Sequence, residues 1–260
     1  MNPVYDPSFL NSSPLTKSRL APNPGPMSLD GTNSYVIGAP DSASVVVVDP
    51  GPLDEAHLAA LAAQGKVELV LITHRHKDHT EGSARFHQLT GAPVRAADPL
   101  YCHGGEPLHD GERIQPAGVE IRVIGTPGHT SDSVCFHLPW DGPNGSVLTG
   151  DTILGRGTTV LDYPDGRLGD YLASLDLLEE LGAASLLPAH GPVLPAVDAV
   201  CREYRSHRQA RLEQIREALA RLGSGAEVQA VTDAVYPDVD PAVRWAAETS
   251  VAAQLDYLRR

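Results

Sequence analysis

The sequence has few cysteines and no long apolar run. Cys102, Cys135 and Cys201 are scattered and form no C-x-x-C pair, which argues against a disulfide framework and favours a reducing, cytoplasmic location. No stretch approaches the roughly 20 apolar residues of a membrane span. The N-terminus has no charged segment followed by an apolar core, so neither a membrane location nor a secretory signal is indicated.

Positive charge is also scarce. The chain has 33 acidic against 20 basic residues, a net charge of −13. Because phosphate contacts supply most nucleic-acid affinity, such a chain is a poor bulk binder of nucleic acid. Net charge does not count bound metal ions, however. If the chain binds such ions, they and a few arginines can hold a short single strand of nucleic acid. With 260 residues, of which 42% are hydrophobic, the chain has room for one large domain and a small appendage.

The most informative feature present is the stretch His74-Arg75-His76-Lys77-Asp78-His79. It follows residues 67–73, a run of branched aliphatic residues that predicts a buried strand ending in a loop. In an extended loop His74 and His76 point the same way, while Asp78 and His79 face a second position beside the first. Imidazoles and carboxylates suit zinc, iron or manganese, so this loop predicts half of a two-metal site.

Three further ligand-type side chains each follow a strand-like segment at a tight turn. They are His129 after residues 120–124, Asp151 after residues 146–147, and His190 after residues 186–187. A rigid strand holds a ligand in place better than a free loop does. Together with the 74–79 motif, these residues supply the roughly seven protein ligands that a dinuclear centre needs.

In this order the motifs resemble the metallo-β-lactamase superfamily, whose pattern is an Asp after an early strand, H-x-H-x-D-H, His, Asp and His. The resemblance spans most of residues 30–195. It implies an α/β (α+β) fold, a four-layer αββα sandwich. It also implies that His74, His76 and His129 bind one metal, that Asp78, His79 and His190 bind a second, and that Asp151 bridges them. Asp49 would hydrogen-bond a ligand imidazole, although a plain turn residue before Pro50-Gly51 is the alternative.

Residues 23–35 and 150–159 most resemble the β-lactamase-like protein 2 branch of that superfamily. Members of this branch resemble single-strand RNA endonucleases with a small winged-helix-like C-terminal segment. We therefore expect a sandwich domain over residues 1–195 and a helical, winged-helix-like segment over residues 196–260, with the β-wing missing or minimal. Within the first domain, the six prolines of residues 1–27 predict a loosely wrapped arm.

The chemistry expected is hydrolysis. Two divalent metals, zinc in the first place and iron or manganese as alternatives, would share a bridging hydroxide as nucleophile. Asp78 and Asp151 are the catalytic carboxylates that would orient it. Single-stranded RNA is the first substrate class, and hydrolysis of a thioester or lactone, as in glyoxalase II, is the alternative. We expect at most weak β-lactamase activity, because zinc β-lactamases resemble sites that have Cys or Ser in the neighbourhood of Asp151.

Substrate contacts are predicted in the loops after Asp151. The candidates are Arg156, Thr158, Tyr163 and Arg167; a guanidinium there suits a phosphate or carboxylate, although ordinary loop chemistry fits equally well. The arginines of residues 202–216 make one helix basic, and a solvated face with Glu203, Glu213 and Glu217 as partners is the favoured interpretation. The sequence indicates no obligatory protein partner and leaves a homodimer open.

Two other classes of function are less favoured. A one-iron oxygenase on this fold would not need a complete second set of ligands. A binding protein without catalysis would have to keep buried His and Asp side chains unpaired, which costs free energy.

Overall fold

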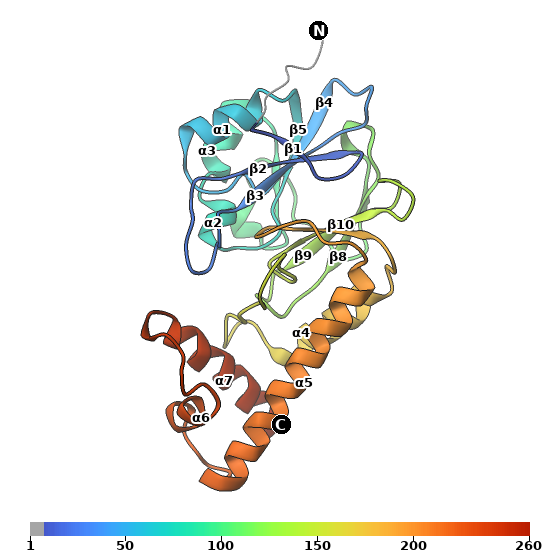
Figure 1. Ribbon diagram of the computed structural model, residues 1–260. Coiled ribbons are helices and arrows are strands. Elements are labelled where there is room, and N and C mark those ends of the chain that lie inside the picture. The colour runs from blue at the N-terminus through green and yellow to red at the C-terminus, as the bar shows by residue number, and fades with distance from the viewer. Residues whose placement is uncertain (1–7) are drawn as a thin grey trace.

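Two mixed β-sheets pack face to face in the computed structural model, which describes residues 8–260 (Figure 1). In the first sheet β4, β5 and β6 are parallel and the other pairs antiparallel. Its strands lie in the order β1 (Leu10–Asn11), β2 (Thr16–Leu20), β3 (Asn33–Ile37), β4 (Ser44–Val48), β5 (Lys66–Leu71) and β6 (Val94–Arg95). In the second sheet only β10 and β11 are parallel. Its order is β11 (Ser185–Pro188), β10 (Ser146–Gly150), β9 (Val134–Leu138), β8 (Ile121–Gly125) and β7 (Arg113–Ile114).

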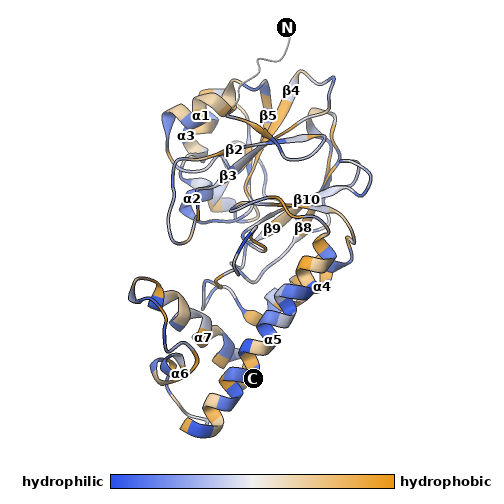
Figure 2. Ribbon diagram, viewed as in Figure 1, coloured by the Kyte–Doolittle hydropathy of each residue, from blue (hydrophilic) through white to orange (hydrophobic). Residues whose placement is uncertain are grey.

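Strand β4 shows why its sequence is a continuous apolar run. Val46 and Val48 point into the core between the two sheets. Val47 points to the opposite face, where it packs with residues of the helices α1 (Glu55–Ala62) and α3 (Ser83–Thr90). A strand buried on both faces needs apolar residues at every position, and Figure 2 shows β4 in hydrophobic colours.

The second sheet is covered on its outer face in the same way. Val147 of β10 and Leu186 of β11 pack with residues of α4 (Leu168–Glu179) and α5 (Val197–Leu222). The order of layers is therefore helices, sheet, sheet, helices, and the predicted αββα sandwich is confirmed. The remaining short helices lie in the loops: α2 (Lys77–Thr80) and the 3-10 turns Pro99–Tyr101 and Pro116–Gly118.

The C-terminal part is helical, as expected. Helix α5 runs past the sandwich, and α6 (Val228–Val235), the 3-10 turn Pro241–Val243 and α7 (Arg244–Arg259) gather at its far end (Figure 1). Ile215, Val231 and Val251 form a small core among these helices. Residues 196–260 contain no strand, so the wing is absent from this segment. The division at residue 195 stays a prediction.

The predicted loose N-terminal arm is wrong for residues 8–27. Residues 1–7 lie outside the described part of the chain. Of the rest, β2 pairs with β3 along its whole length and buries Thr16 and Ser18. The four prolines of residues 8–27 fall outside β1 and β2, at positions where no strand hydrogen bond is lost. Proline content therefore marked the loops around these strands and concealed the strands themselves.

The basic helix α5 pairs with different residues than expected. Arg202 pairs with Asp198 of its own helix, and both Arg202 and Arg205 pair with Glu179 of α4. Of the three expected partners, only Glu213 forms a pair, with Arg216. Because α4 lies beside α5, it presents carboxylates that helical spacing alone could not reveal.

The remaining expectations concern cysteines and the membrane. Cys102, Cys135 and Cys201 are all unpaired, and Cys135 and Cys201 are buried in the core. Over residues 8–260, no helix combines the length and the apolar character needed to cross a bilayer.

His57 makes stability depend on pH. Its side chain is 2% exposed on α1, where Nε2 contacts the Ser34 hydroxyl at 2.9 Å. Burial, with the Arg19 cation nearby, lowers the pKa of His57 to about 4. The unfolded chain, with a pKa near its ordinary value of about 6.5, takes up this proton first. The contribution of a neutral His57 is therefore complete above about pH 6.5 and lost as pH falls towards 4.

Between pH 6.5 and 4, the unfolding free energy of the wild type should fall by about 3 kcal/mol more than that of His57→Gln, which has no imidazole to protonate. Urea denaturation at several pH values measures this difference from wild type. His109→Gln, at an exposed position, should follow the wild-type curve. If the unfolding free energies of wild type and His57→Gln depend on pH in the same way, the assignment to His57 is contradicted.

Candidate metal centre

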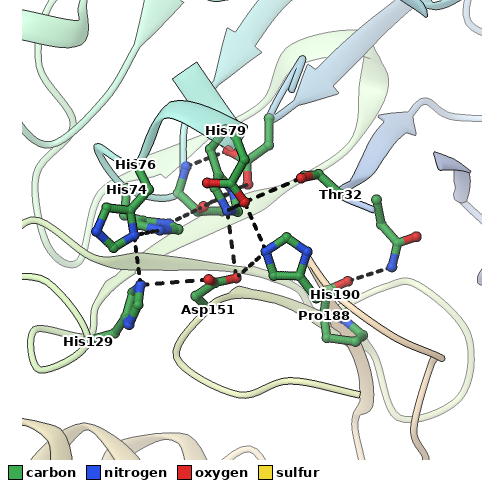
Figure 3. Close-up of polar contacts among 12 residues, drawn as sticks. Thr32, His74, His76, His79, His129, Asp151, Pro188 and His190 are labelled. Carbon is green, nitrogen blue, oxygen red and sulfur yellow. Dashed lines mark hydrogen bonds and ion pairs between the residues drawn. The ribbon is translucent and has the colours of Figure 1, made fainter. Parts of the chain in front are cut away.

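The predicted ligands meet at one edge of the sandwich, where strands from both sheets end. The 74–79 loop follows β5, His129 lies in the β8–β9 loop, and Asp151 and His190 follow β10 and β11. Figure 3 shows the side chains converging from these four segments. Close backbone approach is needed here: at Gly150, with φ +50°, an added Cβ would lie 2.7 Å from Cβ of Thr73.

The first group consists of His74, His76 and His129. Nδ1 of His76 lies 3.0 Å from Nε2 of His74 and 3.0 Å from Nε2 of His129. Nitrogens bound to one tetrahedral zinc at the usual bond length lie about 3.3 Å apart. These three rings therefore present nitrogens with the spacing that a single cation requires, and Asp151 belongs to the same cluster.

The second group consists of Asp78, His79 and His190. Oδ2 of Asp78 lies 3.2 Å from Nε2 of His190 and 3.4 Å from Nε2 of His79. Asp151 lies between the two groups, because its Oδ1 is 3.2 Å from Nε2 of His190 and its Oδ2 is 3.7 Å from Nε2 of His129. The structure thus brings together all seven residues that the sequence singled out as ligands.

The outward nitrogens of the imidazoles contact fixed oxygen atoms. Nδ1 of His129 donates to the Val160 carbonyl at 2.6 Å, and Nδ1 of His190 donates to the Gly31 carbonyl at 3.0 Å. Nε2 of His76 faces Oδ2 of Asp162 at 3.3 Å. A nitrogen that donates outward leaves the other ring nitrogen with its lone pair directed to the centre.

Asp49 orients two imidazoles at once. Its Oδ2 accepts from Nδ1 of His79 at 2.8 Å and from the Thr73 hydroxyl at 2.7 Å. Since that hydroxyl donates to Asp49, it is free to accept from Nδ1 of His74, 3.1 Å away. The Thr73 backbone N–H donates to the other carboxylate oxygen at 2.8 Å. Asp49 is 2% exposed and has a left-handed φ of +49°, which Asp tolerates better than most residues.

Buried atoms without partners show that the residues fit a cation. Among residues 8–260, Nε2 of His79, Nε2 of His190 and Oδ1 of Asp151 are buried and make no hydrogen bond. Leaving a buried polar atom unpaired costs about 1–3 kcal/mol. All three atoms point into the cluster, so coordination of a divalent cation would satisfy them together.

The electrostatics separate the two groups. Burial, reinforced by neighbouring imidazoles, holds the pKa of His74 well below its usual range, and burial lowers the pKa of His129 to about 4. In the second group burial opposes ionisation, but charge pairing outweighs it. Asp151 and Asp78 raise the pKa of His190 to about 10, and imidazoles led by His190 lower the pKa of Asp151 to about 2. His74 and His129 therefore favour the neutral form that binds a cation, while the Asp151 carboxylate stays ionised and attracts positive charge.

Three of the four predicted substrate contacts line cavities next to these ligands. Tyr163 lines a cavity of about 520 Å³ that includes His76, Asp78, His129 and Asp151. Arg156 and Thr158 line a smaller cavity of about 100 Å³ that shares His129 and Asp151 with the first. The Arg156 guanidinium pairs with Asp30 at 3.0 Å on the surface.

Arg167 does not lie beside the candidate centre, so its predicted place is corrected. It lines a separate cavity with Asp256, Tyr257 and Arg260. The reason lies at Gly166, where an added Cβ would come within 2.4 Å of the carbonyl oxygens of Gly128 and His129. The chain passes beneath the His129 turn at this glycine and then leaves to begin α4.

The supporting role of Arg208 at the site was not predicted from the sequence. Its side chain is 3% exposed, its guanidinium donates to the Thr159 carbonyl, and it stacks over Tyr171 at 4.9 Å. The loop that it holds supports two ligands, because Thr159 donates to the Asp151 carbonyl and Val160 accepts from His129. A signal existed: Arg208 falls four residues after Tyr204 and four before Leu212, on the apolar stripe of the helix.

Comparison with known proteins identifies the family. The family model described as the metallo-beta-lactamase superfamily matches residues 27–190. The chain belongs to the metallo-β-lactamase superfamily. The resemblance predicted from the sequence is confirmed, members of the superfamily bind divalent metals, and the protein is a hydrolase.

Two curated relatives and one solved structure are similar over most of the chain. The Beta-lactamase-like protein 2 homolog of Caenorhabditis elegans is 33% identical, over 97% of this chain and 88% of its own. The Atrochrysone carboxyl ACP thioesterase of Aspergillus chevalieri is 34% identical, over 82% of this chain and 68% of its own. The crystal structure of a metallo-beta-lactamase family protein from Thermus thermophilus superposes with a TM-score of 0.76 at 25% identity, over 95% of this chain and 93% of that one.

We expect the protein to bind two divalent ions per chain and the His129→Ala variant to bind one tightly. Removing His129 leaves the first group with two imidazoles and Asp151, whereas the second group is unchanged. Zinc titration by calorimetry, with metal analysis of the dialysed protein, measures the stoichiometry. His109→Ala is the matched control at an exposed histidine. Two tight sites in the His129→Ala variant would contradict the grouping.

Arg208→Met should weaken metal binding at the first group by about tenfold, because Val160 would no longer hold the His129 ring as firmly. The variant also loses the hydrogen bond to the Thr159 carbonyl and the stacking on Tyr171. The metal-free fold should therefore lose about 1–3 kcal/mol of stability as well. Chelator competition and thermal melting separate the two effects. Arg211→Met, which removes a guanidinium stacked on Tyr236 of the same segment, should leave metal binding unchanged.

Proposed function

We propose that this protein is a dinuclear metal-dependent hydrolase that cleaves thioesters. Among the expected substrates, a thioester was the alternative to single-stranded RNA. The observation that carries the proposal is the character of the cavity beside the candidate ligands.

Apart from the ligands, that cavity has mostly apolar walls. Val160, Leu161, Tyr163 and Met27 line it together with Trp245. Among the residues that line the cavity, Lys77 is the only basic one apart from the histidines. Asp162, which also lines the cavity, pairs with Arg75. A small, non-basic pocket suits a neutral acyl group better than a chain of phosphates.

The arginines argue in the same direction. Arg156 pairs with Asp30, Arg167 lies in another cavity, and Arg202, Arg205 and Arg216 of α5 pair with carboxylates of α4 and α5. With a net charge of −13, few cations are left to hold a phosphate backbone. A relative that covers 82% of this chain carries the name of a thioesterase, which adds support.

The roles of the ligands follow from their grouping. His74, His76 and His129 would hold one cation, Asp78, His79 and His190 a second, and Asp151 would contact both. Zinc is the proposed metal, since imidazole and carboxylate ligands suit it, with iron or manganese as alternatives. When bound, such cations polarise a carbonyl and lower the pKa of water.

The chain itself orients water and substrate. Burial alone would raise the pKa of Asp78, but the neighbouring His79 and His190 hold it well below its usual range, so this carboxylate stays ionised. It lines the cavity and accepts from the Thr32 hydroxyl at 3.5 Å. We assign it, with Asp151, the orientation of the attacking water. The water oxygen bonds to the thioester carbon, the carbon–sulfur bond breaks, and the thiol leaves with a proton.

Several finer expectations stay predictions. These are the cleavage of single-stranded RNA, hydrolysis of a lactone, weak β-lactamase activity, a cytoplasmic location and a homodimer. Of these, RNA cleavage is the direct competitor of the proposal, and one experiment can decide between the two.

The metal-loaded protein should hydrolyse hexanoyl-coenzyme A and S-lactoylglutathione faster than it cleaves single-stranded RNA or a β-lactam. Asp151→Ala should lower kcat by roughly 100-fold or more, because it removes a ligand that contacts both cations. His109→Ala should keep the wild-type rate. Release of thiol, measured with a chromogenic thiol reagent, and gel analysis of the RNA provide the readouts. RNA cleavage that is lost in Asp151→Ala, with no thioester turnover, would refute the proposal.

A further inference from the structure

We propose that the N-terminal turn of α7 forms the acyl-binding wall of this site, with Trp245 selecting thioesters of neutral acyl groups that are long or carry an aromatic ring. The inference rests on the proposed thioester hydrolysis and goes beyond it, because it assigns substrate selection to the C-terminal helices.

The cavity of about 520 Å³ joins two distant parts of the chain. His76, Asp78, His129 and Asp151 line it together with Trp245 and Thr249 of α7. A volume of this size matches that of pockets that enclose small organic ligands. A substrate whose reacting carbon is beside the ligands therefore extends towards α7.

Helix α7 presents a defined face to the cavity. Trp245 and Thr249 are four residues apart, so both lie on one side of the helix. Val251 and Leu255 on another side pack into the core with α5 and α6. Arg244, next to Trp245, pairs with Asp233 of α6 and with Glu248. These contacts hold the Trp245 backbone in place independently of any ligand.

Trp245 itself has the features of a binding surface. It is 50% exposed, although Val251 and Leu255 of the same helix are buried. Covering a large ring with another apolar group is favourable in proportion to the area buried, and aromatic pairs gain further from stacking. Met27, also exposed, lines the same cavity and offers an adaptable apolar contact.

The charges of the cavity restrict the acyl group. Asp162 is engaged by Arg75, and the sole lysine is Lys77, next to the ligand Asp78. The cavity has three carboxylates, Asp78, Asp151 and Asp162, so a further carboxylate on the acyl group would meet more negative than positive charge. A neutral aliphatic or aromatic acyl chain therefore fits, whereas a dicarboxylic acyl group does not.

The smaller cavity gives the leaving group a separate direction. It shares Met27, His129 and Asp151 with the first cavity but runs towards Arg156 and Thr158. A thioester needs two exits from its reacting carbon, one for the acyl chain and one for the thiol. The two cavities meet at His129 and Asp151 and differ in most of their other lining residues, which matches that requirement.

The test compares coenzyme A thioesters, so that the leaving group is constant and only the acyl group changes. For wild type, we expect kcat/KM to rise from acetyl through butyryl to hexanoyl by up to about fourfold per methylene. Trp245→Ala should lower kcat/KM at least about tenfold for hexanoyl and benzoyl and less than twofold for acetyl. Trp245→Phe, which keeps a ring, should restore most of the benzoyl rate.

Trp140→Ala is the matched control. Trp140 is 72% exposed, lines neither cavity, and its indole donates to Glu120. This variant should behave as wild type with every thioester. An equal loss for all acyl groups in Trp245→Ala, or no loss, would overturn the acyl wall while leaving thioester hydrolysis intact.

A binding measurement separates this inference from the proposed function. The chain has two tryptophans, so in Trp140→Ala the tryptophan fluorescence comes from Trp245 alone. S-hexyl-coenzyme A, a thioether that cannot be hydrolysed, should shift or quench it, and Thr249→Phe should weaken the response by narrowing the cavity. If wild type hydrolyses no thioester yet this response occurs, the function fails and the apolar subsite stands. If the enzyme hydrolyses thioesters but the Trp245 fluorescence does not respond to S-hexyl-coenzyme A, the subsite is refuted.

Discussion

The site depends on one buried carboxylate. Asp49 accepts hydrogen bonds from the Thr73 backbone, the Thr73 hydroxyl and His79, and through that hydroxyl it also sets the orientation of His74. A charge 2% exposed is costly unless it is fully hydrogen-bonded. Here the same bonds that satisfy Asp49 direct one imidazole of each group towards the centre. The geometry of the candidate ligands is therefore coupled to folding of the first sheet, because Asp49 and Thr73 follow the adjacent parallel strands β4 and β5.

The sandwich then adds the remaining ligands from its second sheet. Asp151 and His190 follow β10 and β11, which are parallel and so end at the same edge. Asn33, at the start of β3 in the first sheet, donates to the carbonyls of Pro188 and Gly191 and fixes the turn that carries His190. The centre is thus assembled across the interface between two sheets, and neither sheet alone holds a complete group of ligands.

Much of the fold and of the candidate site could be predicted from the sequence, because the signals lie within short segments. The 74–79 motif, the strand runs over β4 and β5 and the turns at His129, Asp151 and His190 each have a pattern within a few residues. What escaped depends on distant packing. Arg167 seemed close to the site because it follows Tyr163, but Gly166 lets the chain pass beneath the His129 turn and away. Strand β2 was hidden among prolines because its burial of Thr16 and Ser18 arises only through pairing with β3. The contribution of Trp245 to the cavity has no local signal, since it depends on how α7 returns to the sandwich.

Helix α5 carries a geometric consequence of its own. It is one uninterrupted helix of 26 residues, whose first half packs on the second sheet and whose last turns form the core with α6 and α7. Each residue in a helix adds about 1.5 Å and a rotation of about 100°. A single insertion or deletion between Leu212 and Ile215 would therefore turn α6 and α7 around the helix axis and change which residues line the cavity that now includes Trp245 and Thr249. The length of one helix would in this way decide the shape of the cavity without any change in the candidate ligands themselves.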